Sequence, residues 1–286
     1  MAEVTLKEIY PVPEKFRQKA WIKSRADYEK MWKESVSDPE KFWAKIADEY
    51  ITWFKKWDKV MDCNYGSTTK DLKVKWFTNA KVNVSYNCLD RHLEKRGNQI
   101  ALIWEGNDPS EDRTFTYKQL HEQVCKFANV LKKNGVKKGD RVTFFLPMIP
   151  ELAIGILAST RIGAIHSVVF GGFSAEALRD RIVDCDSQVV VSCDGTFRGA
   201  KAVPQKDNSD KAIAQSPNVK LQIVVKRVGD KIQCAWNDKI DRWWDDEMAK
   251  VDANCPAEQM DAEDPLFILY TSGSTGKPKG VMHTTG

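Results

Sequence analysis

The sequence lacks the long apolar runs and the strong charge imbalance that mark several large classes of protein. No run of 18 apolar residues occurs in its 286 residues, so no membrane span is predicted. The N-terminal residues do not form a basic segment followed by an apolar one, so no signal peptide is predicted. Basic side chains number 44 and acidic ones 40, a formal net charge of +4, which does not favour nucleic-acid binding. We therefore expect a cytoplasmic globular protein that binds neither nucleic acid nor membrane.

Paired cysteines and clustered histidines are also missing. The seven cysteines are an odd number and include no pair separated by just two residues, so buried free thiols are predicted instead of disulfides or a zinc site. The four histidines show no metal-ligand spacing, and none has a serine or cysteine partner that the sequence can identify. No structural metal is predicted.

From residue 88 onward, short apolar runs alternate with longer amphipathic segments. The apolar runs predict strands, at residues 100–104, 113–117, 141–146, 166–170, 188–192, 221–225 and 266–270. The amphipathic segments predict helices, at residues 88–95, 117–134, 150–162, 174–184, 206–215 and 239–249. This alternation is typical of an α/β domain with a mostly parallel sheet flanked by helices.

The first part of the chain has a different pattern. Between residues 14 and 60, long charged side chains surround aromatic residues that recur every eleven positions, at Trp21, Trp32, Trp43 and Phe54. Eleven residues are about three helical turns. We therefore predict a tryptophan-rich helical extension at residues 1–80, followed by the α/β part at residues 81–286.

The most informative segment is a glycine-rich stretch that follows the predicted strand at residues 266–270. It contains three glycines, four hydroxyl side chains and two lysines. Glycines let backbone N–H groups approach an anion, hydroxyls donate hydrogen bonds to its oxygens, and lysines balance its charge. The segment therefore predicts a polyphosphate-binding loop whose candidate residues are Thr271, Ser272, Gly273, Ser274, Thr275, Gly276, Lys277, Lys279 and Gly280.

This loop differs from the phosphate loop of P-loop NTPases. That motif has two glycines five residues apart, followed by lysine and then serine or threonine. Here Gly273 and Gly276 are three residues apart, and Lys277 is followed by Pro278, which disfavours a P-loop NTPase. A flexible glycine–serine linker is the alternative, but Pro278 stiffens the segment and the preceding strand is too apolar to flank a linker.

Two further turns carry residues that could contact a ligand. In Phe170-Gly171-Gly172-Phe173-Ser174, paired glycines let a ligand approach the backbone, and Ser174 is predicted to cap the next helix. In the segment 194–201, Arg198 and Lys201 flank a small pair, Gly199 and Ala200. The two cations either are solvated surface charges or bind an anion.

Several motifs occur in a fixed order along residues 76–286. They include Trp76-Phe77, residues 87–93, Lys138-Gly139-Asp140-Arg141-Val142, residues 147–151, residues 161–166, the Gly171-Gly172 turn, and the segment 263–286 around the glycine-rich loop. Together they resemble the adenylate-forming superfamily, and most closely its acetyl-coenzyme A synthetase branch. The match is most specific in the last segment. Residues 1–75 match only loosely.

The resemblance implies an incomplete N-terminal domain of the adenylate-forming fold that uses MgATP and coenzyme A. It implies that residues 271–280 hold the β- and γ-phosphates of ATP and that Gly172 lies beside the coenzyme A channel. It further implies that coenzyme A is bound by Arg198, Gly199, Ala200 and Lys201. Family members often have a second arginine at the position of Lys201, and lysine keeps the charge but loses the bidentate geometry.

The implied activity is that of an AMP-forming acetate–CoA ligase, in which acetate and ATP give acetyl-adenylate and coenzyme A then releases AMP. The phosphate loop lies in the middle of family members, whereas this sequence ends just after it. We therefore expect the front part of a longer protein, inactive by itself and without the catalytic residues. A propionate–CoA ligase and a non-catalytic nucleotide- or anion-binding module stay open as alternatives.

Overall fold

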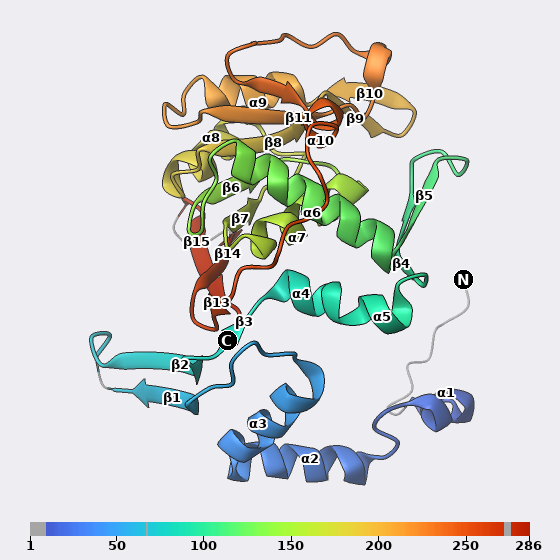
Figure 1. Cartoon of the computed structure of the whole chain (residues 1–286). Helices are drawn as coiled ribbons and strands as arrows, with labels where there is room; N and C mark the ends of the chain where they lie inside the picture. Colours follow the sequence, from blue (N-terminus) through green and yellow to red (C-terminus); the bar gives the residue numbers. More distant parts are fainter. Residues whose placement is uncertain (1–9, 67, 272–275) are drawn as a thin grey trace, which may run out of the picture. The chain divides into compact units, whose positions relative to one another are not determined.

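The computed structural model describes residues 10–66, 68–271 and 276–286, in two compact units, Met1–Ile51 and Thr52–Gly286 (Figure 1). The described part of the first unit contains α1 (Glu14–Lys19), α2 (Arg25–Ser37) and α3 (Pro39–Tyr50). Ser24 and Asp38 accept hydrogen bonds from backbone amides in the first turns of α2 and α3. These caps satisfy amides that have no acceptor inside the helix.

The helical prediction is wrong beyond Tyr50. Strands β1 (Lys59–Tyr65) and β2 (Leu72–Thr78) form an antiparallel hairpin. Met61 lies opposite Trp76 and Cys63 opposite Val74, so apolar residues alternate with polar ones at the period of a strand. The alternation of Leu72, Val74 and Trp76 with lysines has this period, so the signal of a strand is present in the sequence itself. The division of the chain at residue 80 stays a prediction.

A seven-stranded sheet forms the centre of the second unit, in the order β12-β11-β8-β6-β7-β14-β15. Its strands are β6 (Arg141–Phe144), β7 (Ile165–Val168), β8 (Val189–Cys193), β11 (Leu221–Val225), β12 (Asp241–Trp243), β14 (Pro265–Thr271) and β15 (Lys279–Thr284). All neighbours pair in parallel except β15, which pairs antiparallel with β14. The predicted α/β class with a mostly parallel sheet is confirmed.

Helices cover both faces of this sheet (Figure 1). One face packs against α6 (Tyr117–Lys133), α7 (Pro150–Arg161) and α10 (Trp244–Met248). The other packs against α8 (Ala175–Asp184) and α9 (Lys206–Ile213). Strands buried on both faces are apolar along their whole length, which is why β8 and β11 could be predicted from short apolar runs.

The remaining elements connect to this core. Three of them are antiparallel strand pairs: β3 (Lys81–Val82) with β13 (Met260–Asp261), β4 (Ile100–Glu105) with β5 (Asp112–Thr116), and β9 (Gly195–Arg198) with β10 (Lys201–Pro204). The others are the short helices α4 (Val84–Cys88), η1 (Asp90–His92), α5 (Leu93–Arg96) and η2 (Gly229–Lys231).

Two predicted elements need correction. The helix predicted at residues 239–249 begins only at Trp244, because Asp241–Trp243 pairs with β11 as an edge strand. The helix predicted at residues 88–95 is split into α4, η1 and α5. Strand β14 is apolar in sequence but partly exposed, with Leu269 at 48%, because it lies next to the sheet edge.

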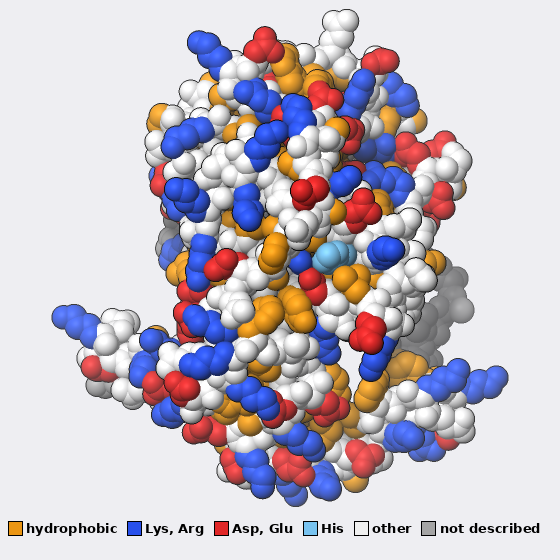
Figure 2. Space-filling view, viewed as in Figure 1, with side chains coloured by type: hydrophobic (Ala, Val, Ile, Leu, Met, Phe, Trp, Pro, Cys, Tyr) orange, Lys and Arg blue, Asp and Glu red, His pale blue; other side chains and the backbone are white. Residues whose placement is uncertain are grey.

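The surface and the cysteines agree with the composition. The face shown in Figure 2 has basic and acidic side chains interspersed. All seven cysteines are free, and four of them, Cys125, Cys185, Cys193 and Cys255, are buried. None of the helices in the described part of the chain is long and apolar enough to cross a membrane.

Candidate functional site

Predicted site residues from distant parts of the sequence line one cavity of about 460 Å³ at the carboxyl edge of the sheet. Gly171 and Gly172 follow β7, Arg198 ends β9, and Leu269 belongs to β14. In open parallel sheets, ligands bind outside the carboxyl ends of the strands. The fold therefore brings the Gly171-Gly172 turn and the basic segment together.

The turn after β7 is closely packed, and a side chain on either glycine would require its neighbours to shift. A Cβ atom on Gly171 would lie 3.1 Å from the carbonyl oxygen of Leu146, and one on Gly172 would lie 2.6 Å from the ring of Phe170. Beneath the turn, the buried amide of Gln205 donates a hydrogen bond to the Phe145 carbonyl at 2.9 Å. The turn is thus packed from below while its backbone stays open to the cavity.

The basic segment is the tip of the β9–β10 hairpin. Arg198 and Lys201 are opposite each other across the strands, and Gly199 and Ala200 form the two-residue turn. Gly199 has φ of 58°, the left-handed conformation that such turns require. Both cations are exposed, and neither has a salt-bridge partner within the part of the chain that the structure describes. Like charges directly opposite each other repel, and a bound anion would remove that repulsion.

A buried carboxylate fixes the base of this hairpin. Asp194 is 2% exposed, and its side chain accepts hydrogen bonds from the amides of Gly195 (2.7 Å), Arg227 (2.8 Å), Val228 (3.1 Å) and Gly229 (2.8 Å). The carboxylate therefore joins β9 to the connection after β11. The one sign of this role in the sequence is a polar residue directly after an apolar strand.

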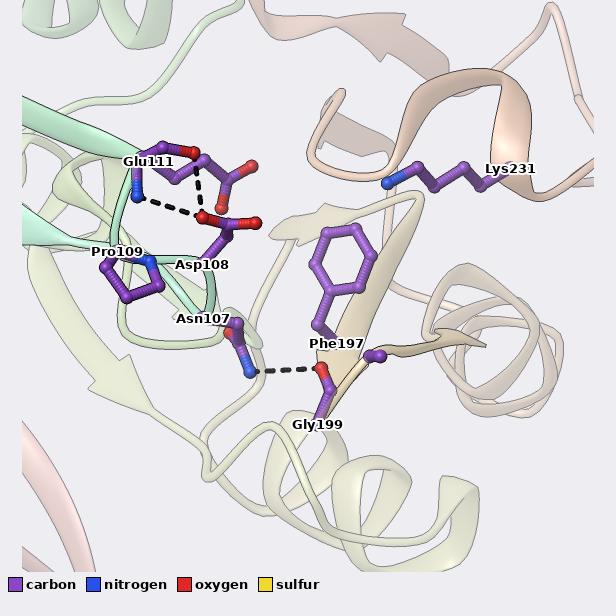
Figure 3. Close-up of a pocket in the computed structure, with 9 residues that line it drawn as sticks. Asn107, Asp108, Pro109, Glu111, Phe197, Gly199 and Lys231 are labelled. Atoms are coloured by element: carbon purple, nitrogen blue, oxygen red, sulfur yellow. Dashed lines mark hydrogen bonds between the residues drawn. The ribbon is translucent and has the colours of Figure 1, made fainter.

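The outer side of the hairpin borders a second cavity, of about 490 Å³ (Figure 3). Phe197 has the guanidinium of Arg227 at 4.8 Å and the ammonium of Lys231 at 4.7 Å from its ring centroid. Arg227 also donates two hydrogen bonds to Glu111, at 3.0 and 2.7 Å, and these lower the pKa of that carboxyl. Across the cavity, the Asn107 side chain donates to the carbonyl of Gly199 at 3.4 Å. The β4–β5 loop therefore braces the hairpin from outside.

The glycine-rich segment connects β14 to β15. Thr271 pairs with Lys279, and Tyr270 with Gly280, while Ser272, Gly273, Ser274 and Thr275 lie outside the described residues. Gly276 has φ of 91° and open space where a Cβ would be. Lys277 borders a third cavity of about 420 Å³. The segment begins at the carboxyl end of β14, the same edge of the sheet at which the β7 turn lies.

His283 packs in a row of rings. Its ring stacks on Phe267 with centroids 4.4 Å apart, and Phe267 stacks on His166 at 5.4 Å. Burial lowers the pKa of His166 to about 4, so this histidine is neutral near pH 7. The stacking indicates that His283 supports the strands next to the glycine-rich loop.

The parallel sheet and the glycine-rich segment between β14 and β15 define the class of protein. The chain belongs to the AMP-binding enzyme family, which residues 89–286 match, and residues 28–88 match the acetyl-coenzyme A synthetase N-terminus. Among its curated relatives are the acetyl-coenzyme A synthetases of Syntrophus aciditrophicus, 54% identical over 281 residues, and of Rhizobium rhizogenes, 55% identical over 283 residues. These alignments cover 97% and 98% of this chain but 42% of each relative.

A solved structure supports the fold. The acetoacetyl-CoA synthetase from Streptomyces lividans superposes with a TM-score of 0.79 at 25% sequence identity. The match covers 89% of this chain and 38% of that one. The chain therefore spans less than half the length of the relatives that it matches.

Proposed function

We propose that the protein to which these residues belong is an AMP-forming acetate–CoA ligase. Acetate attacks the α-phosphorus of MgATP, giving acetyl-adenylate and pyrophosphate, and the thiolate of coenzyme A then displaces AMP to form acetyl-CoA. The names of the relatives favour acetate as the acid over propionate. Because the chain spans 42% of those relatives, we propose that the 286 residues alone do not catalyse the reaction.

The residues of this chain act by binding charge. The lysines and backbone amides of residues 271–280 hold the β- and γ-phosphates of ATP, and the magnesium ion arrives with the nucleotide as part of the substrate. Fixed donors stabilise the charge that develops on phosphoryl oxygens without having to reorganise. Arg198 and Lys201 hold the phosphates of coenzyme A, while Gly199, Ala200 and Gly172 let it approach the backbone.

A single observation carries this proposal. The cavity of about 460 Å³ has Gly172 on one wall, Arg198 on another, and Leu269, from the strand that leads to the glycine-rich segment, on a third. A nucleotide held by that segment and a thiol ligand held by the hairpin would meet at this edge of the sheet. A module that binds one nucleotide without catalysis needs only one such segment.

Pyrophosphate exchange tests the activity. The full-length protein is expected to exchange labelled pyrophosphate into ATP when acetate is present and to do so more slowly with propionate, and Lys277→Ala should lower the rate about tenfold or more. The 286-residue chain should show no exchange. Absence of acetate-dependent exchange in the full-length protein would refute the ligase, and stoichiometric ATP binding without exchange would favour the non-catalytic module.

The coenzyme A assignment makes a separate prediction. Arg198→Ala in the full-length protein should raise the KM for coenzyme A about tenfold, the loss of roughly 1.4 kcal/mol of binding, while pyrophosphate exchange survives. Lys201→Arg adds a bidentate donor and should leave coenzyme A binding unchanged or tighter. Lys239→Ala, at an exposed lysine outside the hairpin, is the control. If Arg198→Ala abolished exchange and left the KM for coenzyme A intact, the assignment would be wrong.

A further inference from the structure

Arg181 in α8 is a buried arginine without a carboxylate partner within the described residues. It is 8% exposed, and its Nη1 donates a hydrogen bond to the carbonyl of Ala177 at 2.6 Å. Burying a charge without an ionic partner is costly. Other contacts must therefore offset the desolvation of this guanidinium.

Two aromatic rings supply those contacts. The guanidinium carbon lies 4.7 Å from the ring centroid of Phe173 and 5.3 Å from that of Tyr270. Such cation–π contacts are strongest where water is excluded. The hydroxyl of Tyr270 also donates to Asp184 at 2.7 Å, so that ring is held to α8 at its polar end as well.

The two rings belong to the two segments that carry the proposed function. Phe173 directly follows the Gly171-Gly172 turn and packs edge to face on Phe170, with ring centroids 5.6 Å apart. Tyr270 lies in β14, next to the glycine-rich segment. Lys277 borders the same cavity of about 420 Å³ as Arg181 and Tyr270. Arg181 thus lies where the two segments can be held by one side chain.

We propose that Arg181 is a positioning residue shared by the Gly171-Gly172 turn and the glycine-rich loop. It contacts no substrate in this role. It fixes the turn through Phe173 and, through Tyr270, the end of β14 at which the glycine-rich loop begins. The substrates named for the two segments rest on the proposed function, whereas the structural link between the segments does not. Loss of Arg181 therefore disturbs both segments together. Loss of the ring in one segment disturbs the other segment as well.

Hydrogen exchange of the 286-residue chain tests the link without any activity. Arg181→Met keeps the side-chain stem and removes the charge. It should speed amide exchange about tenfold at residues 170–173 and at residues 276–280, and Arg181→Lys should speed it less. Lys211→Met is the control, because Lys211 is an exposed cation in the neighbouring helix α9 and borders none of the cavities described above. Faster exchange confined to α8, or to one of the two segments, would overturn the proposal.

A second variant keeps Arg181 and alters one of the two rings that it contacts. Phe173→Leu should speed amide exchange at residues 276–280, which lie close to Tyr270 in the sequence and far from Phe173. It should do so only when Arg181 is present. An equal effect in the Arg181→Met background would show that the link does not pass through Arg181.

Partial reactions of the full-length protein supply the functional readout. Arg181→Met should raise the KM for coenzyme A and lower the rate of pyrophosphate exchange, each about tenfold, with partial recovery in Arg181→Lys. A lower melting temperature with both parameters unchanged would mean a purely structural role and would refute the proposal. If the wild-type protein shows no exchange, the ligase proposal fails, and the amide exchange of the two segments decides the role of Arg181.

Discussion

At the scale of single residues, His121 belongs to an ion-pair network between η1, α6 and α7. Its Nε2 lies 3.2 Å from Asp90, and Arg161 donates to both oxygens of Asp90 at 2.7 and 2.8 Å. The hydrogen bond to Asp90 raises the pKa of His121 to about 9. Burial raises the pKa of Asp90, but hydrogen bonds from Arg161 and His121 outweigh it and lower that pKa to about 2.

This network predicts a loss of stability in alkaline solution. The pKa of His121 is higher in the folded state than its unfolded value of 6.5. Its contribution to the free energy of unfolding is therefore complete below pH 6.5 and is lost as the pH rises through about 9. The free energy of unfolding should fall by about 1–3 kcal/mol over this range, counting the His121–Asp90 pair once. Urea unfolding at several pH values measures it.

His121→Gln keeps a donor for Asp90 but cannot titrate, so its stability should be lower at pH 6.5 and nearly flat up to pH 9. His283→Gln, a change outside the network, should retain the wild-type slope. A slope that persists in His121→Gln would assign the alkaline loss to another group.

The residues proposed to bind anions are recognisable from the sequence, but the residues that support them are not. The glycines, hydroxyls and cations at residues 198–201 and 271–280 stand together in the chain, so local composition reveals them. Asp194 and Gln205 act through groups that only the fold brings near: the amides after β11 and the carbonyl of Phe145. Arg181 is likewise an ordinary helical arginine until α8 places it between Phe173 and Tyr270.

At the scale of elements, the β9–β10 hairpin depends on Asp194. Asp194→Ala leaves four amides without their acceptor, and since a buried unsatisfied group costs about 1–3 kcal/mol, the total loss of stability should be about 3 kcal/mol or more. On the proposed coenzyme A assignment, the KM for coenzyme A of the full-length protein should rise as well, because the hairpin tip carries Arg198. Urea unfolding and thioester kinetics measure the two effects.

Asp230→Ala is the matched control, because that carboxylate is fully exposed and lies in η2 near the same connection. It should change neither the free energy of unfolding nor the KM by a measurable amount. Asp194→Asn should be intermediate, since an amide accepts at one oxygen and presents N–H groups where an acceptor is needed. Equal effects of Asp194→Ala and Asp230→Ala would refute the anchoring role.

Elements with a clear apolar pattern could be predicted, and the shortest strands could not. Strands β8 and β11 and helices α6 and α7 carry apolar patterns set by the core. The strands β9, β10 and β12 have three or four residues each and are partly exposed, so no apolar period distinguishes them. Their pairing is decided by neighbouring chain segments.

At the scale of the whole molecule, the second unit holds the hydrophobic clusters found in the described residues. Two lie on opposite faces of the main sheet, and a small third one surrounds Ala80, Val82 and Ala262. All their members fall within Thr52–Gly286. The described part of the first unit has Ala47 as its one buried apolar residue. Burial of apolar surface is the main stabilising contribution to folding, so the second unit has its own source of stability.

The second unit should therefore fold by itself. A chain of residues 52–286 should unfold in one cooperative transition, with a midpoint temperature within about 5 °C of the 286-residue chain. Circular dichroism during heating measures both chains. Residues 1–264 are the contrasting truncation, because they lose β14 and β15 and expose the edge of β7, and their midpoint should fall by considerably more. A chain of residues 52–286 that unfolded without cooperativity would show that its clusters need the first 51 residues to form a stable core.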